Sequence, residues 1–337
     1  MTAAPALSRG LVEATEPPEW RGIARDAVRM LVTDRATRSH SHKHFCDLPS
    51  LLRSGDLLVV NDSATLPAAL VCHPERSRSV GNSIPLHIST KIDERLWMVE
   101  PRGPVTSGEK LTLSGGGTAT MLSPIDPWRP RVWYATFEMG EPMYAYLAKH
   151  GAPIRYAYLT RTFPLQTYQT IFARTEGSSE MPSAARPFTE RVVAGLCDNG
   201  IAIATITLHC GVASFEHPER PGSERFIVPA ETAARVNAAR REGRRVVAVG
   251  TTVVRALESA ASEDGIIASQ GWTDLFINET HQLKSIDALI SGFHEATATH
   301  LAMLRALADA PLLDEAYAEA ADRSYYYHEF GDIHLIQ

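Results

Sequence analysis

The sequence predicts an α/β main domain interrupted by a small antiparallel β-domain, and three observations support this fold class. The chain has 337 residues, more than the roughly 100–200 typical of one domain, so we expect two domains. Residues 66–150 hold short apolar runs between Gly, Pro and Ser clusters, a pattern typical of a barrel or sandwich. After Arg155, helical segments alternate with apolar strands. We therefore expect a discontinuous main domain of residues 1–65 and 151–337.

The N-terminal part of the main domain begins with an expected β-hairpin. Residues 28–45 alternate between apolar and polar positions around the turn-like DRATR. A short helix is expected in residues 47–53, and the apolar run DLLVVND then predicts a strand. This strand ends at Asn61 and Asp62, so polar side chains follow directly after a buried segment.

The C-terminal part of the main domain is divided by residues that start and stop helices. Thr189 is expected to cap a helix over residues 189–197, and the run IAIATITLH at 201–209 predicts a buried strand. Residues 229–243 form a helix that begins at a proline and stops at a glycine. Residues 245–249 are the next expected strand.

The composition is that of a globular protein, with 44% hydrophobic and 21% charged residues. No apolar run approaches membrane-spanning length and the N-terminal residues lack a secretory pattern, so we expect a cytoplasmic protein without a membrane partner. A net charge of -6 argues against binding to nucleic acid mainly through global electrostatics. The basic run RREGRR at 240–245 is better explained as the end of a helix. The sequence carries no signal of oligomeric state.

The sequence holds two groups of potential metal ligands, and neither predicts a metal site. No CxxC pair occurs among the cysteines, which are Cys46, Cys72, Cys197 and Cys210. We expect them to be small buried apolar residues. His40, His42 and His44 share one face of the expected hairpin, a spacing that suits a metal but is more typical of a solvated hairpin edge.

The run VVAVGTTVVRALESA at 246–260 is the most informative segment, because a strand, a tight turn and a helix follow one another. Gly250 allows a ligand to approach the backbone, and the first helical turn offers free N–H groups to an anion or a ribose oxygen. Thr251 and Thr252 add hydroxyl donors. The alternative is that one of these threonines simply caps the helix.

Arg255 and Glu258 lie three residues apart on the helix that follows, where they are able to pair with each other. The alternative function for Arg255 is to hold the carboxylate of a ligand, since a guanidinium is a planar two-pronged donor. The spacing does not distinguish these two roles.

Further candidates follow other expected strands. His209, with Cys210 beside it, lies at the carboxyl end of a strand, where a histidine is able to act as acid or base unless it is bonded structurally. The same two alternatives apply to His294. In GWTDLFINET, Trp272 and Phe276 provide rings for stacking on a base and Asp274 a carboxylate for a ribose hydroxyl. The alternative for Trp272 is a core residue at a strand entry.

Together these segments resemble one family, the S-adenosylmethionine:tRNA ribosyltransferase-isomerases of queuosine biosynthesis. The matching segments, in the family's order, are DLLVVNDSATLPAAL, TYQTIFA, TLHCGVASF, SERFIVP, VVAVGTTVVRALESA, GWTDLFI, IDALISGFH and FGDIHLI. The resemblance implies an α/β main domain with an inserted small antiparallel β-barrel domain. It also implies transfer of the ribosyl group of S-adenosylmethionine to a 7-aminomethyl-7-deazaguanine in tRNA, with rearrangement to an epoxycyclopentane, release of adenine and methionine, and no metal.

The resemblance suggests roles for individual residues. His209 and Glu224 are the acid/base candidates, because the sulfonium acidifies the adjacent ribose hydrogens and a positioned base is then able to remove one. The cofactor-binding candidates are Gly250, Thr251, Thr252, Arg255, Trp272, Asp274 and Phe276. The candidates for binding the acceptor substrate are Asn61, Ser183, Phe188, Thr189, Phe293 and His294.

Several positions depart from the family pattern where an acceptor site is expected. The APTAGLHF-like segment is MPSAARPF here, so Pro187 replaces a histidine, and a proline supplies neither a proton nor a backbone donor. Ala64 and Ala69 replace arginines of the NDTRVIPARL-like segment. These departures leave two alternatives open: a relative that cleaves or rearranges S-adenosylmethionine with a small-molecule acceptor or none, and a non-catalytic cofactor- or RNA-binding protein.

Overall fold

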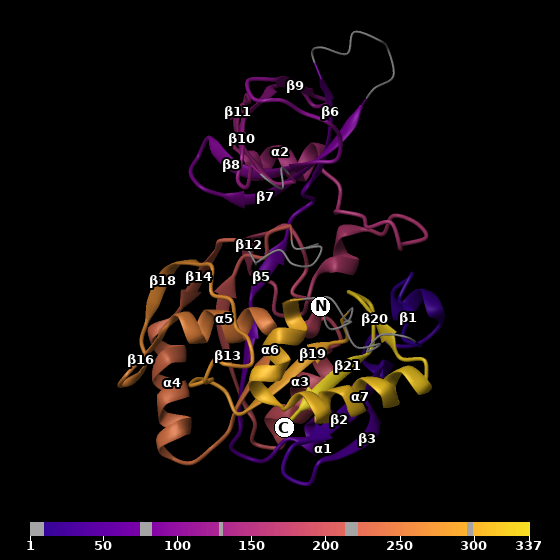
Figure 1. Cartoon of the computed structure of the whole chain (residues 1–337), viewed down its shortest axis with the longest axis vertical. Helices are drawn as coiled ribbons and strands as arrows, with labels where there is room; N and C mark the ends of the chain where they lie inside the picture. Colours follow the sequence, from indigo (N-terminus) through magenta and orange to yellow (C-terminus); the bar gives the residue numbers. More distant parts are fainter. Residues whose placement is uncertain (1–9, 75–82, 128–130, 213–221, 295–298) are drawn as a thin grey trace.

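The computed structural model describes residues 10–74, 83–127, 131–212, 222–294 and 299–337. A small β-barrel lies above a larger layer of sheet and helices (Figure 1). The predicted fold class, an α/β domain with an antiparallel barrel inserted in its sequence, is therefore confirmed. None of the helices in these ranges has the length and apolar character needed to cross a bilayer.

Six antiparallel strands close the barrel in the order β10-β11-β8-β7-β6-β9 within the described residues. Their bounds are β6 Ala69–Pro74, β7 Ile84–Lys91, β8 Leu96–Pro101, β9 Lys110–Leu113, β10 Thr118–Pro124 and β11 Trp133–Glu138. Alternate residues point inward, and Leu111, Ala119 and Ala135 are fully buried in one barrel core. Helix α2 (Met143–His150) contributes Leu147 to this core.

The main domain is built on a nine-stranded mixed sheet in the order β18-β14-β13-β4-β15-β19-β21-β2-β3, counted over the described residues. The strands are β2 Arg29–Asp34, β3 Ser39–His44, β4 Leu57–Asn61, β13 Ala202–Leu208, β14 Glu224–Val228, β15 Val246–Val249, β18 Ser269–Thr273, β19 Ala288–Gly292 and β21 Ile333–Ile336. The central strands β13, β4, β15 and β19 are mutually parallel, so their carboxyl ends share one edge. Because β4 leads directly toward the barrel, this edge faces the barrel (Figure 1).

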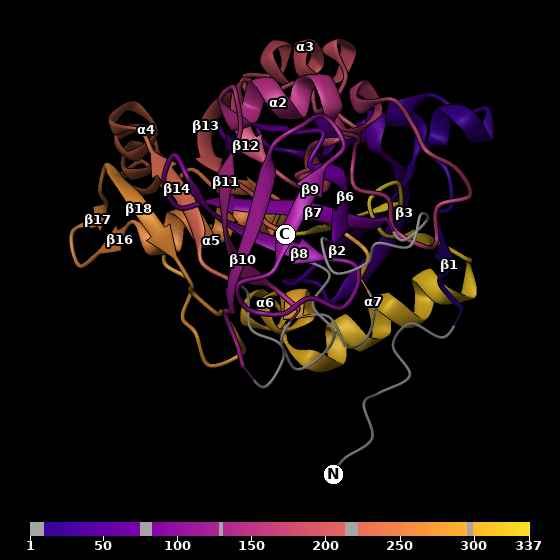
Figure 2. The ribbon, with the colours of Figure 1, turned by 90° about the horizontal axis from the view of Figure 1, so that it is seen from above.

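Helices cover both faces of this sheet. Their bounds are α1 Leu48–Leu51, α3 Glu190–Asp198, α4 Ala230–Arg241, α5 Thr251–Ser259, α6 Thr299–Leu307 and α7 Ala310–Asp322. Along β4, Leu57 and Val59 face a core shared with α4 to α7, whereas Leu58 and Val60 face a core shared with α1 and α3. Figure 2 shows α3 and the pair α6 and α7 on opposite sides of the molecule.

Short strand pairs complete the fold. They are β1 (Val12–Glu13) with β20 (Tyr326–Tyr327), β5 (Ser63–Thr65) with β12 (Thr175–Ser178), and β16 (Ala261–Ser262) with β17 (Gly265–Ile266). The pair β5 and β12 lies between the sheet and the barrel in Figure 1. It thereby brings residues near position 177 to the edge where the parallel strands end.

Most expected elements are confirmed, and the exceptions concern exposure. The predicted hairpin is β2 and β3, an antiparallel pair at the edge of the sheet. The expected burial of all cysteines is wrong: Cys197 is exposed on α3 and Cys46 is half-buried. The alternative that places Trp272 in a core is also wrong, because 45% of this side chain is exposed on the outermost strand β18.

Candidate functional site

Residues predicted separately from four segments meet at the carboxyl edge of the parallel strands. Strand β4 ends at Asn61, His209 directly follows β13, Gly250 directly follows β15, and His294 lies two residues beyond β19. Because ligands of open α/β sheets bind outside the carboxyl ends of the parallel strands, this edge is the candidate site.

Asn61 joins three of these elements from a fully buried position. Its Nδ2 donates to the carbonyl of Leu208 at 2.8 Å and to Oγ1 of Thr252 at 3.3 Å. Its Oδ1 accepts from the backbone N–H groups of Ser63 at 3.1 Å and Leu208 at 3.0 Å. Since both ends of the amide are occupied, Asn61 holds β4, β13 and α5 together, and the bonds described for it are structural.

His209 is held by one ring nitrogen and leaves the other unoccupied. Its Nδ1 lies 2.8 Å from Oγ of Ser63, which in turn lies 2.6 Å from Oγ of Ser178. Nε2 has no hydrogen-bond partner among the described residues. A Cβ on Gly177 would lie 2.4 Å from Nδ1, so only glycine allows this approach of β12 to the ring. The imidazole is therefore fixed in place by its surroundings.

The electrostatic surroundings keep His209 neutral. Burial lowers the pKa of His209 to about 4, and the positive charge of Arg225 lowers it as well. A histidine with this pKa carries no charge near pH 7, so it accepts a proton but does not start as a proton donor. The structure therefore favours the base alternative over the acid alternative for this residue.

The turn between β15 and α5 depends on a glycine. Gly250 is the N-cap of α5 at φ 91° and ψ 152°, a conformation open essentially to glycine alone. No side chain caps this helix, so the expected capping by Thr251 or Thr252 is wrong. The first turn of α5 therefore keeps N–H groups directed out of the helix end, and Thr252 presents its hydroxyl beside Asn61.

Arg255 does not pair with Glu258, as one interpretation of the sequence expected, but with Glu224 on β14. Its remaining donors reach the carbonyls of Leu275 at 3.1 Å and Thr273 at 3.1 Å. Glu258 instead accepts from Ser285 and its neighbours. Each of the three guanidinium nitrogens of Arg255 donates to a group of the fold, so Arg255 fastens α5 to the edge strands.

Glu224 has both carboxylate oxygens engaged. Oε2 pairs with Arg255, and Oε1 accepts from the backbone N–H of Gly211 at 2.9 Å. Gly211 belongs to the segment after β13 that also carries His209. Glu224 is thus a positioning residue for this segment, and the acid/base role expected for it is not supported by its contacts.

Three expected acceptor contacts are structural in the folded chain. The Thr189 hydroxyl accepts from the N–H of Val192 at 3.4 Å as the N-cap of α3 and donates to Asp26 at 2.6 Å. Phe188 is 1% exposed and packs edge-on against Phe45. Phe293 is fully buried. The two phenylalanines are buried in the core, and Thr189 is half-buried with its hydroxyl engaged, so the contacts of all three residues are structural.

His294 lies at the strand edge but is shielded. Its ring stacks on His300 with centroids 4.1 Å apart, and its Nε2 lies 3.3 Å from Oγ of Ser291. Burial lowers the pKa of His294 well below its ordinary value, and the neighbouring His300 and His328 contribute in the same direction. His294 is therefore a neutral side chain at the β19 end of the edge.

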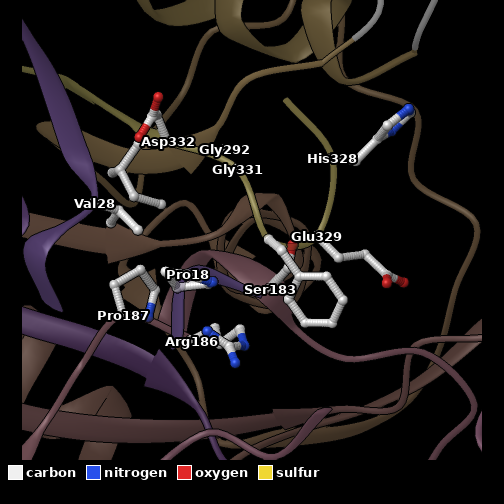
Figure 3. A pocket seen from close by; sticks show the side chains of 12 residues that line it. Pro18, Val28, Ser183, Arg186, Pro187, Gly292, His328, Glu329, Gly331 and Asp332 are labelled. Atoms are coloured by element: carbon white, nitrogen blue, oxygen red, sulfur yellow. The ribbon is translucent and has the colours of Figure 1, made fainter. Parts of the chain in front are cut away.

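A pocket adjoins the end of β19 and contains the proline that departs from the family pattern. Its lining residues are Pro18, Val28, Ser183, Arg186, Pro187, Gly292, His328, Glu329, Phe330, Gly331, Asp332 and Ile333. Figure 3 shows Pro187 and Val28 on one side and His328 and Glu329 on the other. Of the expected acceptor contacts, Ser183 lines this pocket.

The pocket carries an unusual pair of charged residues. Arg186 is 2% exposed and donates to Glu19 at 3.0 Å and to the carbonyl of Thr167 at 3.0 Å. Burial raises the pKa of Glu329 to about 7, and its Oε2 has no hydrogen-bond partner among the described residues. Arg186 is therefore committed to the fold, whereas the Glu329 carboxyl bonds the Tyr158 side chain and keeps one oxygen without a described partner.

The aromatic segment at β18, beside β14 in the sheet, lies at the opposite end of the edge. Trp272 and Asp274 are exposed at the outermost strand, and Phe276 is half-buried just beyond it. None of the described residues gathers three His, Cys, Asp or Glu side chains in a way that would hold a metal ion.

Three contributors were missed by the sequence analysis. Ser63 and Ser178 orient His209, and Ser89 of barrel strand β7 accepts from the N–H of Val212 at 3.0 Å while its carbonyl accepts from Ser179 at 2.6 Å. The pattern NDS at the end of a buried strand was a signal for Ser63. No local sequence pattern predicts the contacts of Ser89, because its partners Ser179 and Val212 are distant in the sequence.

Comparisons with known proteins agree over nearly the whole chain. A family model described as a queuosine biosynthesis protein matches residues 10–336. An S-adenosylmethionine:tRNA ribosyltransferase-isomerase of Moorella thermoacetica is 36% identical over 93% of each chain. A protein of the same description from Thermotoga maritima is 32% identical over 96% of this chain and 95% of its own. A crystal structure of the Thermotoga maritima S-adenosylmethionine tRNA ribosyltransferase matches with a TM-score of 0.55, at 29% identity over 96% of each chain.

Proposed function

Because the chain belongs to the queuosine biosynthesis protein family, we propose that it transfers and isomerises the ribosyl group of S-adenosylmethionine onto 7-aminomethyl-7-deazaguanine in tRNA. The observation that carries this proposal is the match to proteins of that description over 93% of both chains. A tRNA acceptor also implies action in the cytoplasm. In this reaction S-adenosylmethionine is a substrate that donates its ribosyl group, and adenine and methionine are released.

We place S-adenosylmethionine at the carboxyl edge of the parallel strands. The first turn of α5 offers N–H groups, which suit a carboxylate or a ribose hydroxyl, and Gly250 lets a ligand come close to the backbone. The Thr252 hydroxyl lies at the same helix end. The pairing of Arg255 with Glu224 argues against the other role expected for it, which is to hold the methionine carboxylate.

His209 is the proposed base. A sulfonium acidifies the hydrogens on the adjacent ribose carbon, so a positioned base removes one of them and leaves a carbanion stabilised by sulfur. The proton passes to Nε2, the ring nitrogen without a partner among the described residues. Ser63 holds the other nitrogen at 2.8 Å and so fixes the direction of the ring. Adenine then leaves and the acceptor amine attacks.

Incubation of the purified chain with S-adenosylmethionine and a tRNA that carries the deazaguanine base tests the proposal. Adenine release that requires this tRNA is the expected result, and His209→Gln is expected to abolish the release while S-adenosylmethionine still binds.

The position of Pro187 in the pocket favours a second candidate, a relative with a small-molecule acceptor or none. Adenine release that is indifferent to tRNA would support that candidate, and cofactor binding without any release would support a non-catalytic protein.

A further inference from the structure

One row of side chains crosses three strands on the same face of the sheet. The backbone N–H of His209 donates to the carbonyl of Arg225 at 3.0 Å, continuing the register of β13 with β14. Arg225 is in turn the direct partner of Trp272 on β18. Directly paired residues on neighbouring strands point to the same face, so His209, Arg225 and Trp272 lie side by side.

This face is not covered at its outer end. The residues next to the row, Phe226 and Thr273, point the other way: Phe226 belongs to the core beneath α5, and Thr273 lies 2.6 Å from Ser259 of α5 through their hydroxyls. The core on the face of the row contains no residue of β14 or β18 among those described. Strands β14 and β18 form the outer flank of the sheet below the barrel in Figure 1.

The two outer residues of the row, Arg225 and Trp272, have side chains suited to binding a nucleotide. Trp272 exposes 45% of its side chain. Arg225 is exposed, and its guanidinium has no carboxylate or carbonyl partner in the described part of the chain. An exposed indole offers a stacking surface for any base, and an unpaired guanidinium attracts a phosphate. The exposed carboxylate of Asp274 follows Trp272 by two residues and disfavours a phosphate near the end of β18, so we assign the phosphate to Arg225.

The spacing of the row relates this contact to the proposed base. Neighbouring strands are about 4.8 Å apart, so Trp272 lies two strands, roughly 10 Å, from His209. One nucleotide step of an unstacked strand spans this order of distance. We propose that Trp272 and Arg225 bind the nucleotide next to the reacting base of the acceptor RNA, with its base stacked on Trp272 and its phosphate held by Arg225.

This inference rests on the proposed function, and its test separates the two. A fluorescently labelled tRNA transcript is titrated with the full chain, without S-adenosylmethionine, and binding is followed by anisotropy. Trp272→Ala is expected to weaken tRNA binding by roughly fivefold or more, and Trp272→Phe to retain most of the affinity. Arg225→Gln is expected to weaken binding and to reduce the slope of log affinity against log salt by about 0.7.

The matched control is Arg240→Gln, because Arg240 is also exposed and its side chain is without a described partner, but it lies at the far end of α4. This variant is expected to bind tRNA as the unchanged chain does. Calorimetry of S-adenosylmethionine binding supplies the second readout. Unchanged tRNA affinity in Trp272→Ala and Arg225→Gln would overturn the inference, as would a loss of S-adenosylmethionine affinity alone, which would assign Trp272 to adenine. Adenine release by the unchanged chain reports separately on the proposed function.

Discussion

At the scale of single residues, His209 is the group on which the proposed chemistry depends. Ser63 and Ser178 orient it, Gly177 leaves room for it, and its depressed pKa keeps it neutral. The sequence placed this histidine correctly at a strand end but did not reveal its serine partners. Those partners come from β5 and β12, which are paired only in the folded chain.

The depressed pKa of His209 predicts how stability depends on pH. The folded-state pKa of about 4 lies below the ordinary value of 6.5, so the contribution of the neutral ring is fully present above pH 6.5 and is lost as the pH falls toward 4. Between pH 7.5 and pH 5 the unfolding free energy should fall by about 2 kcal/mol more in the unchanged chain than in His209→Gln. Urea unfolding at both pH values measures this, and equal losses in both proteins would contradict it.

The Glu224 and Arg255 pair gives a second prediction. The two side chains are 11% and 8% exposed, so removing one leaves a buried charge without its partner. Arg255→Ala should lower the unfolding free energy by about 3 kcal/mol or more, measured by urea unfolding. The double variant Arg255→Met with Glu224→Gln should lose less, since no unpaired charge remains. Unchanged stability with weakened S-adenosylmethionine binding would return Arg255 to the ligand site.

At the scale of elements, local patterns predicted which segments form helices and strands, and tertiary packing decided what their polar residues do. Hydrophobic periodicity, together with the residues that cap or stop helices, predicted the bounds of these elements closely: β4, α3, β13, α4, β15 and α5. The same patterns suggested that Arg255 pairs with Glu258, one helical turn away, but Arg255 pairs with Glu224 on β14. A pairing across strands depends on the order of strands in the sheet, which periodicity does not encode.

Thr189 at the start of α3 was predicted to have two roles, as the cap of the helix and as a contact to the acceptor substrate. Thr189 caps the helix and also donates to the buried Asp26. Thr189→Ala should therefore lower the unfolding free energy by about 1–2 kcal/mol, and Thr189→Ser should retain nearly all of it, as measured by urea unfolding. If Thr189→Ala were fully stable but raised the KM for tRNA, the acceptor contact originally expected for Thr189 would be the better explanation.

At the scale of the whole molecule, the insertion of the barrel after β5 places it over the edge where the parallel strands end. Ser89 of the barrel is bonded to Val212 and Ser179, which flank the segment of His209 in space. The change in sequence pattern near residue 66 predicted a separate β-unit. Its orientation over the edge was not predictable, because the contacts that fix it join residues roughly 90 to 120 positions apart.

The whole structure also shows where the segment that departs from the family pattern, with Arg186 and Pro187, lies relative to the sheet. Pro187 and Arg186 lie at the pocket beside β19, whereas Arg225 and Trp272 lie at the opposite end of the same edge. An acceptor RNA held at the β14 and β18 end does not depend on the residues that changed near Pro187. The altered segment is thus compatible with a tRNA acceptor.

The most direct test of the central claim is the mass of the modified nucleoside. The purified chain is incubated with S-adenosylmethionine and tRNA that contains 7-aminomethyl-7-deazaguanine, and the digested nucleosides are analysed by mass spectrometry. We predict that the deazaguanosine nucleoside gains the mass of the rearranged ribosyl group, in step with adenine release, and that His209→Gln abolishes both. A nucleoside of unchanged mass, with S-adenosylmethionine either intact or cleaved, would contradict the assignment.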